Sequence, residues 1–413
     1  MLLQYIKQSL QILRENRLVS IVSILGTALA IALVMVMFMV YQIKTANYAP
    51  ETARDRTLYG SVASRPKPGM TGQSNNTGFS YPLIKNWLYD LKTPAVVAAF
   101  YSGGESLLAI PAKQLYADYR VKWTDEYFWK AYQFRFLEGR PFTSDEINAG
   151  VPKAIISEEV ARQLFHGEKA IGQIVDIDLK PHEIVGVVAD VSRATGYAYA
   201  QVWATLTSNA DAIASWNEDT VGGLMLVLQA HSKKDLLEMQ EELDNVLKRC
   251  SDNNLQYQIE ASTYSAIDWI VGVSSGKYYL QNLLIILFLL LLPALNLTGI
   301  TMNNIRKRSS EVGIRKAFGA TGNTLMGQIL IENLVITAIG ALIGFLLSFF
   351  FVYISRSFLL TADTMLTMGM LFQPANFVAA VVFCLVMNLL SAGVPAWRMS
   401  RQPIVYSLTG KTI

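Results

Sequence analysis

The sequence of 413 residues combines 52% hydrophobic residues with only 16% charged residues, and its mean hydropathy is +0.30. These values exclude an ordinary soluble protein and place part of the chain in lipid. The net charge of +3 is too small for a nucleic-acid-binding protein. Three histidines and two cysteines cannot build a Cys-rich zinc or iron–sulfur site, and they exclude a disulfide framework.

The first segment, residues 1–17, has apolar residues at helical spacing. Leu3, Ile6 and Leu10 would share one face of a helix, while Lys7 and Arg14 would lie on others. This pattern predicts an amphipathic helix on the cytoplasmic face of the membrane, in contact with lipid.

Four apolar stretches without charged residues follow, and each is as long as the roughly 20 residues that a spanning helix needs. A cleavable signal sequence is rejected for the first stretch, because its apolar core is longer than the about 7–15 residues of a signal peptide. The chain is therefore expected to be an α-helical membrane protein with four transmembrane helices, at residues 18–43, 279–302, 327–355 and 376–397.

A polar segment, residues 46–276, separates the first two apolar stretches. Strand and helix patterns in it predict a large α+β domain between transmembrane helices 1 and 2. Residues 46–110 and 210–276 each read as a β-α-β unit, and together they form a porter-like layer. The helices of this layer are expected at Tyr81–Leu91 and Lys233–Lys248. Residues 111–209 form an inserted subdomain with a short helix at Glu158–Phe165.

Basic residues gather in residues 1–17, 303–326 and 398–413, where the acidic residues are only Glu15 and Glu311. The positive-inside rule therefore places both termini and the loop of residues 303–326 in the cytoplasm. The α+β domain would then lie on the other side, in the periplasm. The localisation that follows is the inner, or cytoplasmic, membrane.

Small residues in two of the predicted helices indicate close helix packing. Gly26 and Ala30 lie four apart in helix 1, and Gly340 and Gly344 lie four apart in helix 3. Such spacing lets two helix backbones approach, although small residues also occur there by chance. Two polar residues, Asn296 and Glu332, are candidate anchors that would bond to other helices or loops.

The cytoplasmic loop contains the pattern of a short, capped helix. Glu311 would favour its N-terminus, Arg315 and Lys316 its C-terminus, and Gly319 would provide the left-handed stop. The alternative is a basic loop that only sets topology, but that role needs no apolar ridge. Ile314 and Phe318 would form such a ridge and would contact another protein.

A search for catalytic chemistry finds little. Thr409-Gly410-Lys411-Thr412 resembles part of a phosphate-binding loop, but Val405 stands where its first glycine is needed. We therefore expect no catalytic residue, cofactor-binding residue or metal ligand in this chain, and no enzyme activity of its own.

Three motifs resemble those of the MacB/FtsX-like ABC transporter permease family. The stretch Ser310–Ala320 is similar to the core of the FtsX-like permease domain. Leu137–Phe142 and Ser157–Phe165 resemble the MacB-type periplasmic core domain, and Pro395–Ile404 is similar to the family's C-terminal ending. Unlike MacB itself, the sequence shows no fused ATPase domain.

The resemblance implies a permease dimer, either homomeric or heteromeric, on a pair of separate ABC ATPase subunits that bind ATP and Mg²⁺. It assigns the contact with the ATPase to Glu311, Ile314, Arg315, Lys316, Phe318 and Gly319. A periplasmic adaptor and an outer-membrane channel are further candidate partners, and no nucleic acid is expected. The work would be export or efflux of a peptide, antibiotic, lipoprotein or similar cargo. Two alternatives stay open: an FtsX-like signalling subunit that regulates an external hydrolase, and a receptor without an ATPase.

Overall fold

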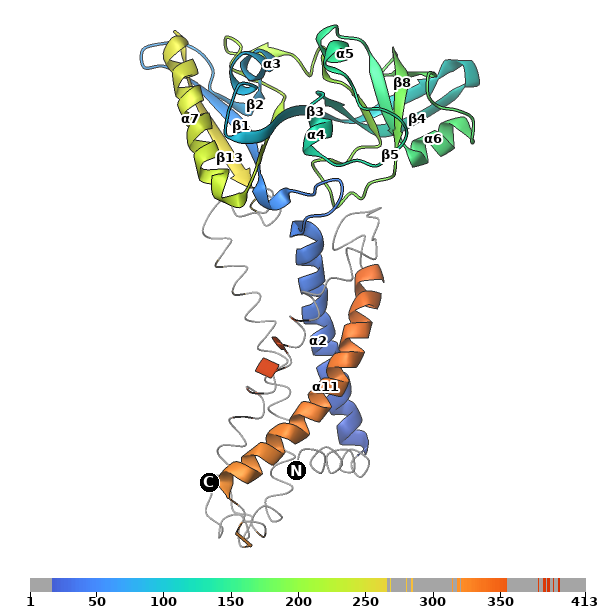
Figure 1. Cartoon of the computed structure of the whole chain (residues 1–413), viewed down its shortest axis with the longest axis vertical. Coiled ribbons are helices and arrows are strands. Elements are labelled where there is room, and N and C mark those ends of the chain that lie inside the picture. Colours follow the sequence, from blue (N-terminus) through green and yellow to red (C-terminus); the bar gives the residue numbers. More distant parts are fainter. Residues whose placement is uncertain are drawn as a thin grey trace. The chain divides into compact units, whose positions relative to one another are not determined.

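The computed structural model describes residues 17–265 and 321–354 as continuous segments, and it adds the isolated positions 268, 280, 284, 314, 318–319, 378, 382–383, 385–386, 389 and 393. The chain divides into two compact units. One contains the apolar helices, and the other, which we call the core domain, runs from Lys44 to Ser274 with Asp363–Met365. Figure 1 shows the described helices and strands of both units.

Two long helices form the described part of the apolar unit, α11 (Gly322–Ile354) and α2 (Arg17–Thr45), of which the last two residues already belong to the core domain. Within the described segments, these two are long and apolar enough to cross a membrane, over Ser20–Thr45 and Asn333–Ile354. The predicted spans 279–302 and 376–397 lie almost entirely outside the described residues, as do residues 1–16 and 398–413.

Helix α11 begins at Gly322, five residues before the start predicted from the apolar stretch. Thr321 explains the difference, because its hydroxyl accepts a hydrogen bond from the Thr324 amide at 3.4 Å and so caps the first turn. The apolar stretch therefore marks the part of α11 that is apolar enough to cross a membrane, and the polar first turns of the helix extend beyond it.

The core domain is built on a sheet of 13 strands in the order β10-β11-β2-β1-β12-β3-β4-β9-β6-β8-β5, with β13 on β1 and β7 on β3 and β8. Most neighbours are antiparallel, and the parallel pairs are β4 with β9 and β6 with β8. The strands are β1 (Thr57–Pro66), β2 (Asn75–Phe79), β3 (Pro94–Ile110), β4 (Leu115–Thr124), β5 (Phe136–Gly139), β6 (Lys153–Ser157), β7 (Ile174–Ile177), β8 (Lys180–Val188), β9 (Val202–Thr205), β10 (Ser215–Trp216), β11 (Val221–Gly222), β12 (Met225–Ala230) and β13 (Tyr257–Ser265).

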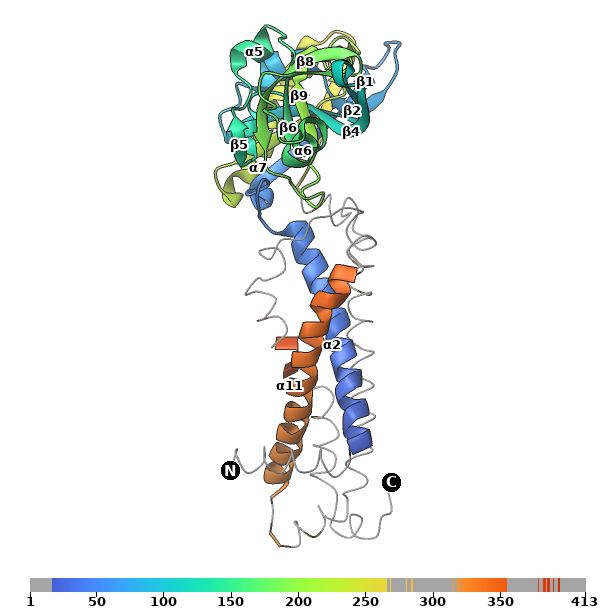
Figure 2. The same ribbon diagram turned by 90° about the vertical axis from the view of Figure 1, so that its right-hand side faces the viewer.

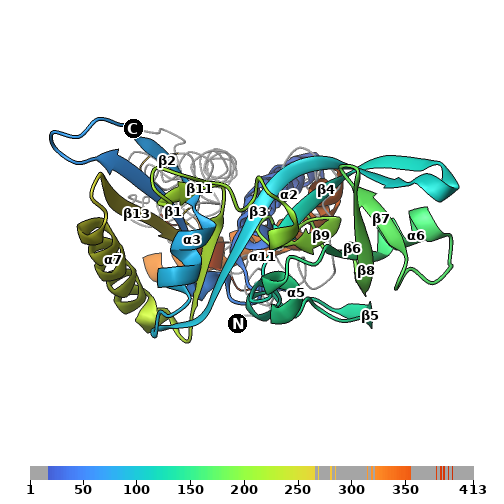
Figure 3. The ribbon, with the colours of Figure 1, turned by 90° about the horizontal axis from the view of Figure 1, so that it is seen from above.

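Strand β3 joins the two parts of the core domain. Its first half pairs with β12, with Ala98 opposite Val227, and its second half pairs with β4 and β7. The register shifts between Ser102 and Gly104, so the strand is bulged there but continues for 17 residues in all. Figure 3 shows β3 running through the middle of the core domain.

The described helices of the core domain are α3 (Tyr81–Leu83), α4 (Phe128–Ala131), α5 (Ser144–Asn148), α6 (Glu158–Phe165) and α7 (Leu236–Asn253). The bounds of α6 confirm the sequence prediction, and the Ser157 hydroxyl caps it by accepting from the Val160 amide. The predicted helix at Tyr81–Leu91 is too long, because α3 continues only as one wide turn, Ile84–Leu88. The Glu242 carboxylate then binds the amides of Lys92 and Thr93, which start the approach to β3.

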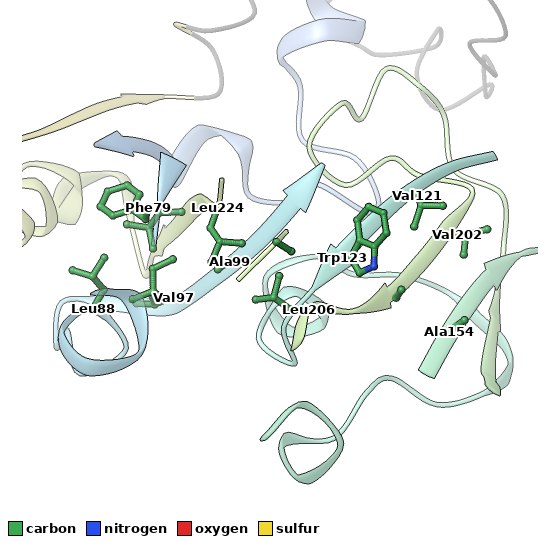
Figure 4. Packing of buried hydrophobic residues seen from close by; sticks show 14 of the residues in the cluster. Phe79, Leu88, Val97, Ala99, Val121, Trp123, Ala154, Val202, Leu206 and Leu224 are labelled. Atoms are coloured by element: carbon green, nitrogen blue, oxygen red, sulfur yellow. The ribbon is translucent and has the colours of Figure 1, made fainter. Parts of the chain in front are cut away.

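Side chains of adjacent strand residues alternate between two separate hydrophobic clusters, one on each face of the sheet. Val97 and Ala99 belong to the larger cluster, which α6 and α7 also enter. Figure 4 shows part of it, with Phe79 and Leu88 beside Val97. Phe100 and Trp203 belong to the second cluster, which is rich in aromatic rings. The two faces are therefore covered independently.

Candidate coupling and transmission site

Three of the six residues assigned to ATPase contact lie within the described residues. The Phe318 amide donates to the Ile314 carbonyl at 3.1 Å, which is the hydrogen bond of a helical turn. Gly319 follows with φ +91°, which confirms the left-handed stop predicted for it. The Ile314 and Phe318 side chains are 50% and 88% exposed, so one helical turn carries two large apolar side chains that are accessible to a partner. The other three residues, Glu311, Arg315 and Lys316, lie outside the described residues, as does Asn296.

Helices α2 and α11 pack tightly at the glycines predicted for helix contact. A Cβ added at Gly340 would lie 2.8 Å from Thr27 Cβ, and one at Gly344 would overlap the Ala28 carbonyl oxygen. Glycine is therefore required at both positions, since a Cβ would have to displace backbone or a branched side chain. Figure 2 shows the two helices side by side, as Figure 1 does.

On α2, the contact with α11 is made by residues next to the predicted Gly26. Thr27 and Ala28 are buried and touch the glycines, whereas Gly26 and Ala30 are half-buried. Close packing of Gly26 and Ala30 against another helix therefore stays a prediction. Glu332 lies in the helical backbone of α11, and its side chain is outside the described residues.

A buried ion pair lies where α2 ends and the core domain begins. Arg54 Nε donates to Glu51 Oε2 at 2.5 Å, and the two side chains are 0% and 1% exposed. We call Glu51 and Arg54 the junction pair. The Arg54 guanidinium also donates to the carbonyl oxygens of Lys44 and Ala46, at 3.0 and 3.3 Å, and lies over the Tyr48 ring at 4.4 Å. Burial opposes its charge, but attraction to Glu51 and Tyr48 raises the pKa of Arg54 above its ordinary value.

The same pair binds a distant segment, the loop between β8 and β9 (residues 189–201). Arg54 donates to the Ala194 carbonyl at 2.6 Å. Glu51 Oε1 accepts from the amides of Tyr197 and Ala198, both at 2.9 Å. One buried ion pair thus connects the chain just after α2 to a loop about 140 residues away in sequence.

The core domain holds this loop from other sides as well. Lys122 of β4 donates from its amine to the Tyr197 carbonyl, and Trp203 of β9 donates to the Ala198 carbonyl at 3.2 Å. The Tyr59 ring of β1 stacks on Tyr197 with 3.5 Å between ring centroids. Burial lowers the pKa of the Lys122 amine to about 7. The loop is therefore fixed by groups from three strands in addition to the junction pair.

Comparison with known proteins adds the family. The profile of the MacB-like periplasmic core domain matches residues 20–246, and the profile of the FtsX-like permease C-terminal domain matches residues 283–404. The chain belongs to the MacB/FtsX-like ABC transporter permease family. The motif-based resemblance of the sequence to this family is confirmed.

Curated relatives of this permease share modest identity with it. The uncharacterized ABC transporter permease YknZ of Bacillus subtilis is 26% identical over 208 residues, which are 50% of each chain. The macrolide export ATP-binding/permease protein MacB of Photorhabdus laumondii is 25% identical over 250 residues, 56% of this chain and 35% of MacB. The permease thus spans about half of the first relative and about a third of the second. The crystal structure of the periplasmic region of MacB from Actinobacillus actinomycetemcomitans matches with 13% identity and a TM-score of 0.39, over 54% of this chain and 96% of that one.

Among residues 17–265, 321–354 and the isolated positions, no group of three His, Cys, Asp or Glu side chains is placed to hold a metal ion. The junction pair is the feature that sequence reasoning missed. Its only local sign is a glutamate and an arginine three residues apart, soon after an apolar helix.

Proposed function

We propose that this chain is the permease subunit of a MacB-like ABC transporter, in which a separate ATPase subunit hydrolyses ATP bound with Mg²⁺. The observation that supports the ATPase contact best is the exposed pair Ile314 and Phe318, one turn before Gly319, inside the FtsX-like part of the chain. Exposed apolar side chains on one short helical turn are typical of a docking ridge.

In this proposal the permease is a mechanical transmitter in the cytoplasmic membrane, with four helices and both termini inside the cell. Neither residues 20–43 of α2 nor residues 333–354 of α11 contain a charged residue, so these spans offer no relay for ions or protons. ATP binding would close the ATPases and move the loop of residues 303–326. The helices would carry this motion to the core domain in the periplasm.

The work of the core domain would be the export or efflux of a peptide, antibiotic, lipoprotein or similar cargo. A second permease copy or homologue, a periplasmic adaptor and an outer-membrane channel are the partners that such work requires. These partners and the class of cargo follow from the family alone.

The test is the removal of the Phe318 ring. A seated Phe contributes on the order of 2 kcal/mol at about 25 cal/mol per Å² of buried apolar area, which corresponds to a more than tenfold loss of affinity. We expect Phe318→Ala to insert and dimerise normally but to release the ATPase during detergent purification. Charge reversal at Glu311 should have a weaker effect of the same kind.

The matched control is Leu255→Ala, which removes a side chain 82% exposed in the core domain and should leave ATPase binding unchanged. Wild-type amounts of ATPase with Phe318→Ala would remove this ridge from the mechanism. If no ATPase co-purifies with the wild-type chain itself, the receptor alternative is favoured instead.

A further inference from the structure

The end of α2 is held by a group that a helix end requires. The last carbonyl oxygens of an α-helix have no partner within the helix, and a cation there also interacts favourably with the helix dipole. The Arg54 guanidinium supplies both the hydrogen-bond donor and the positive charge. It donates to the carbonyl oxygen of Lys44, which lies in the last turn of α2, and to that of Ala46. The last turn of α2 is therefore bonded to a side chain of the core domain.

The other bonds of the junction pair lead away from α2. Three of them reach the β8–β9 loop, through the Ala194 carbonyl and the amides of Tyr197 and Ala198. This loop runs directly into β9, which pairs with β4 on one side and β6 on the other. If the loop moves, β9 and the strands paired with it therefore move as well, and these strands belong to the inserted part, residues 111–209.

A stabilising role alone explains the pair poorly. Removing two charges from water costs about as much as their attraction returns, so apolar replacements of buried pairs are often neutral or stabilising. By contrast, the pair makes directional hydrogen bonds to five backbone groups. These bonds fix the position and orientation of the end of α2 relative to the β8–β9 loop. An ion pair of this kind serves as a joint better than as a source of stability.

We infer that the junction pair is the joint that transmits the movement of α2 to the inserted part of the core domain, with Glu51 and Arg54 as positioning residues. This inference rests on the proposed function, because it requires an ATP-driven movement of α2. It names which part of the core domain is driven: the inserted part, which the β8–β9 loop enters through β9.

The test uses a variant that removes the guanidinium bonds to the Lys44, Ala46 and Ala194 carbonyl oxygens, and with them the link between α2 and the loop, but keeps the fold. Arg54→Ala alone would leave Glu51 as an unpaired buried charge and would unfold part of the protein. The double variant Glu51→Gln/Arg54→Met leaves no charge, and the glutamine oxygen still accepts from Tyr197 and Ala198. The carbonyl oxygens that Arg54 releases are in partly buried hydrogen bonds, so water can replace the guanidinium.

Two spin labels report the movement in the full permease with its co-purified ATPase in lipid nanodiscs. One label replaces Arg162 on α6, in the inserted part, and the other replaces Asn245 on α7; both positions are exposed. Cys250 and Cys384 are first changed to serine. Dilution with unlabelled permease limits distances between copies, and double electron–electron resonance is recorded with and without ATP and vanadate.

We expect the wild-type distance distribution to shift on addition of ATP and vanadate, and the double variant to lose this shift while it melts within a few degrees of wild type. Arg140→Ala is the matched control, because it breaks the ion pair with Glu146, far in sequence from the junction, and should keep the shift. A folded double variant with the wild-type shift overturns the joint. A wild type that binds its ATPase but shows no shift overturns the proposed transmission, and the joint with it.

Discussion

The contact of α2 with α11 and the contacts that hold the last turn of α2 use opposite chemistry. Against α11, the backbone of Ala28 meets Gly344 with no side chain between them. At its last turn, α2 is bonded through the Lys44 carbonyl to a buried guanidinium. One helix is thus fixed by close packing in its apolar part and by charged hydrogen bonds at its end.

The difference follows from the surroundings. In lipid, helices gain little from apolar burial against one another, so close approach at small residues provides the attraction. Beyond the apolar span, a charged side chain can enter the fold if its hydrogen bonds replace water. The first kind of contact sets the distance between helices, and the second sets the orientation of the chain that leaves the helix. Three substitutions test this division.

The largest effect is expected at the junction. Arg54→Ala leaves the Glu51 carboxylate buried without its partner, and loss of one member of such a pair costs about 3–5 kcal/mol. We expect a large fall in the melting temperature of the purified full chain. Arg140→Ala, which breaks a bidentate but half-exposed pair, should cost less, on the order of 1 kcal/mol. Equal effects of the two variants would show that the junction pair is no more than a surface ion pair.

A smaller effect is expected at the helix contact. Gly344→Ala places a Cβ against the Ala28 carbonyl, and such overpacking costs about 1–3 kcal/mol. The control is Gly327→Ala on the same helix, where nothing lies within 4 Å of the added carbon. Alanine favours a helix over glycine by up to about 1 kcal/mol at both positions, so the difference between the variants isolates the clash. The measurement is the unfolding midpoint of each variant in detergent. Equal changes for Gly344→Ala and Gly327→Ala would contradict the tight contact.

The last effect appears as a slope with pH and not as a single loss of stability. Burial lowers the pKa of Lys122 from 10.5 to about 7, with Glu51 opposing the change and Arg120 adding to it. Between these pH values the unfolded chain binds a proton that the folded chain does not, so the free energy of unfolding rises with pH. The rise is at most about 1.4 kcal/mol per pH unit.

Lys122→Met removes the titrating group, so we expect its stability to rise less than that of wild type between pH 7 and 10. Thermal unfolding of the full chain at several pH values measures the difference. Parallel curves for the two proteins would mean that Lys122 stays charged in the fold, with its pKa near the ordinary value.

Local pattern was enough to predict several parts of the molecule. The bounds predicted for α6 are correct to the residue, and the structure places the Ser157 cap directly before the helix. The glycine spacing predicted the α11 side of the helix contact, since only glycine lets a backbone come so near. In each case the residues that cause the structural feature lie within a few positions of the residues that predict it.

The parts that could not be predicted depend on residues far apart in the chain. Nothing near Glu51 indicates that its partners are the amides of Tyr197 and Ala198, because those amides are placed by the turn of a distant loop. Nothing in the sequence shows that β3 continues past Tyr101, since Ser102 and two glycines follow, yet its bulge lets the pairing continue onto β4. Both features are set by the sheet as a whole.

The position of β1 has a consequence for the order in which the core domain folds. This strand pairs early with β2, over residues 62–64, but its remaining partners, β12 and β13, come only with the chain up to residue 265. Pairing between such distant segments is slow, and an unpaired strand edge invites association with other chains. The edge of β1 that β13 covers therefore stays unpaired until nearly the whole core domain has been made.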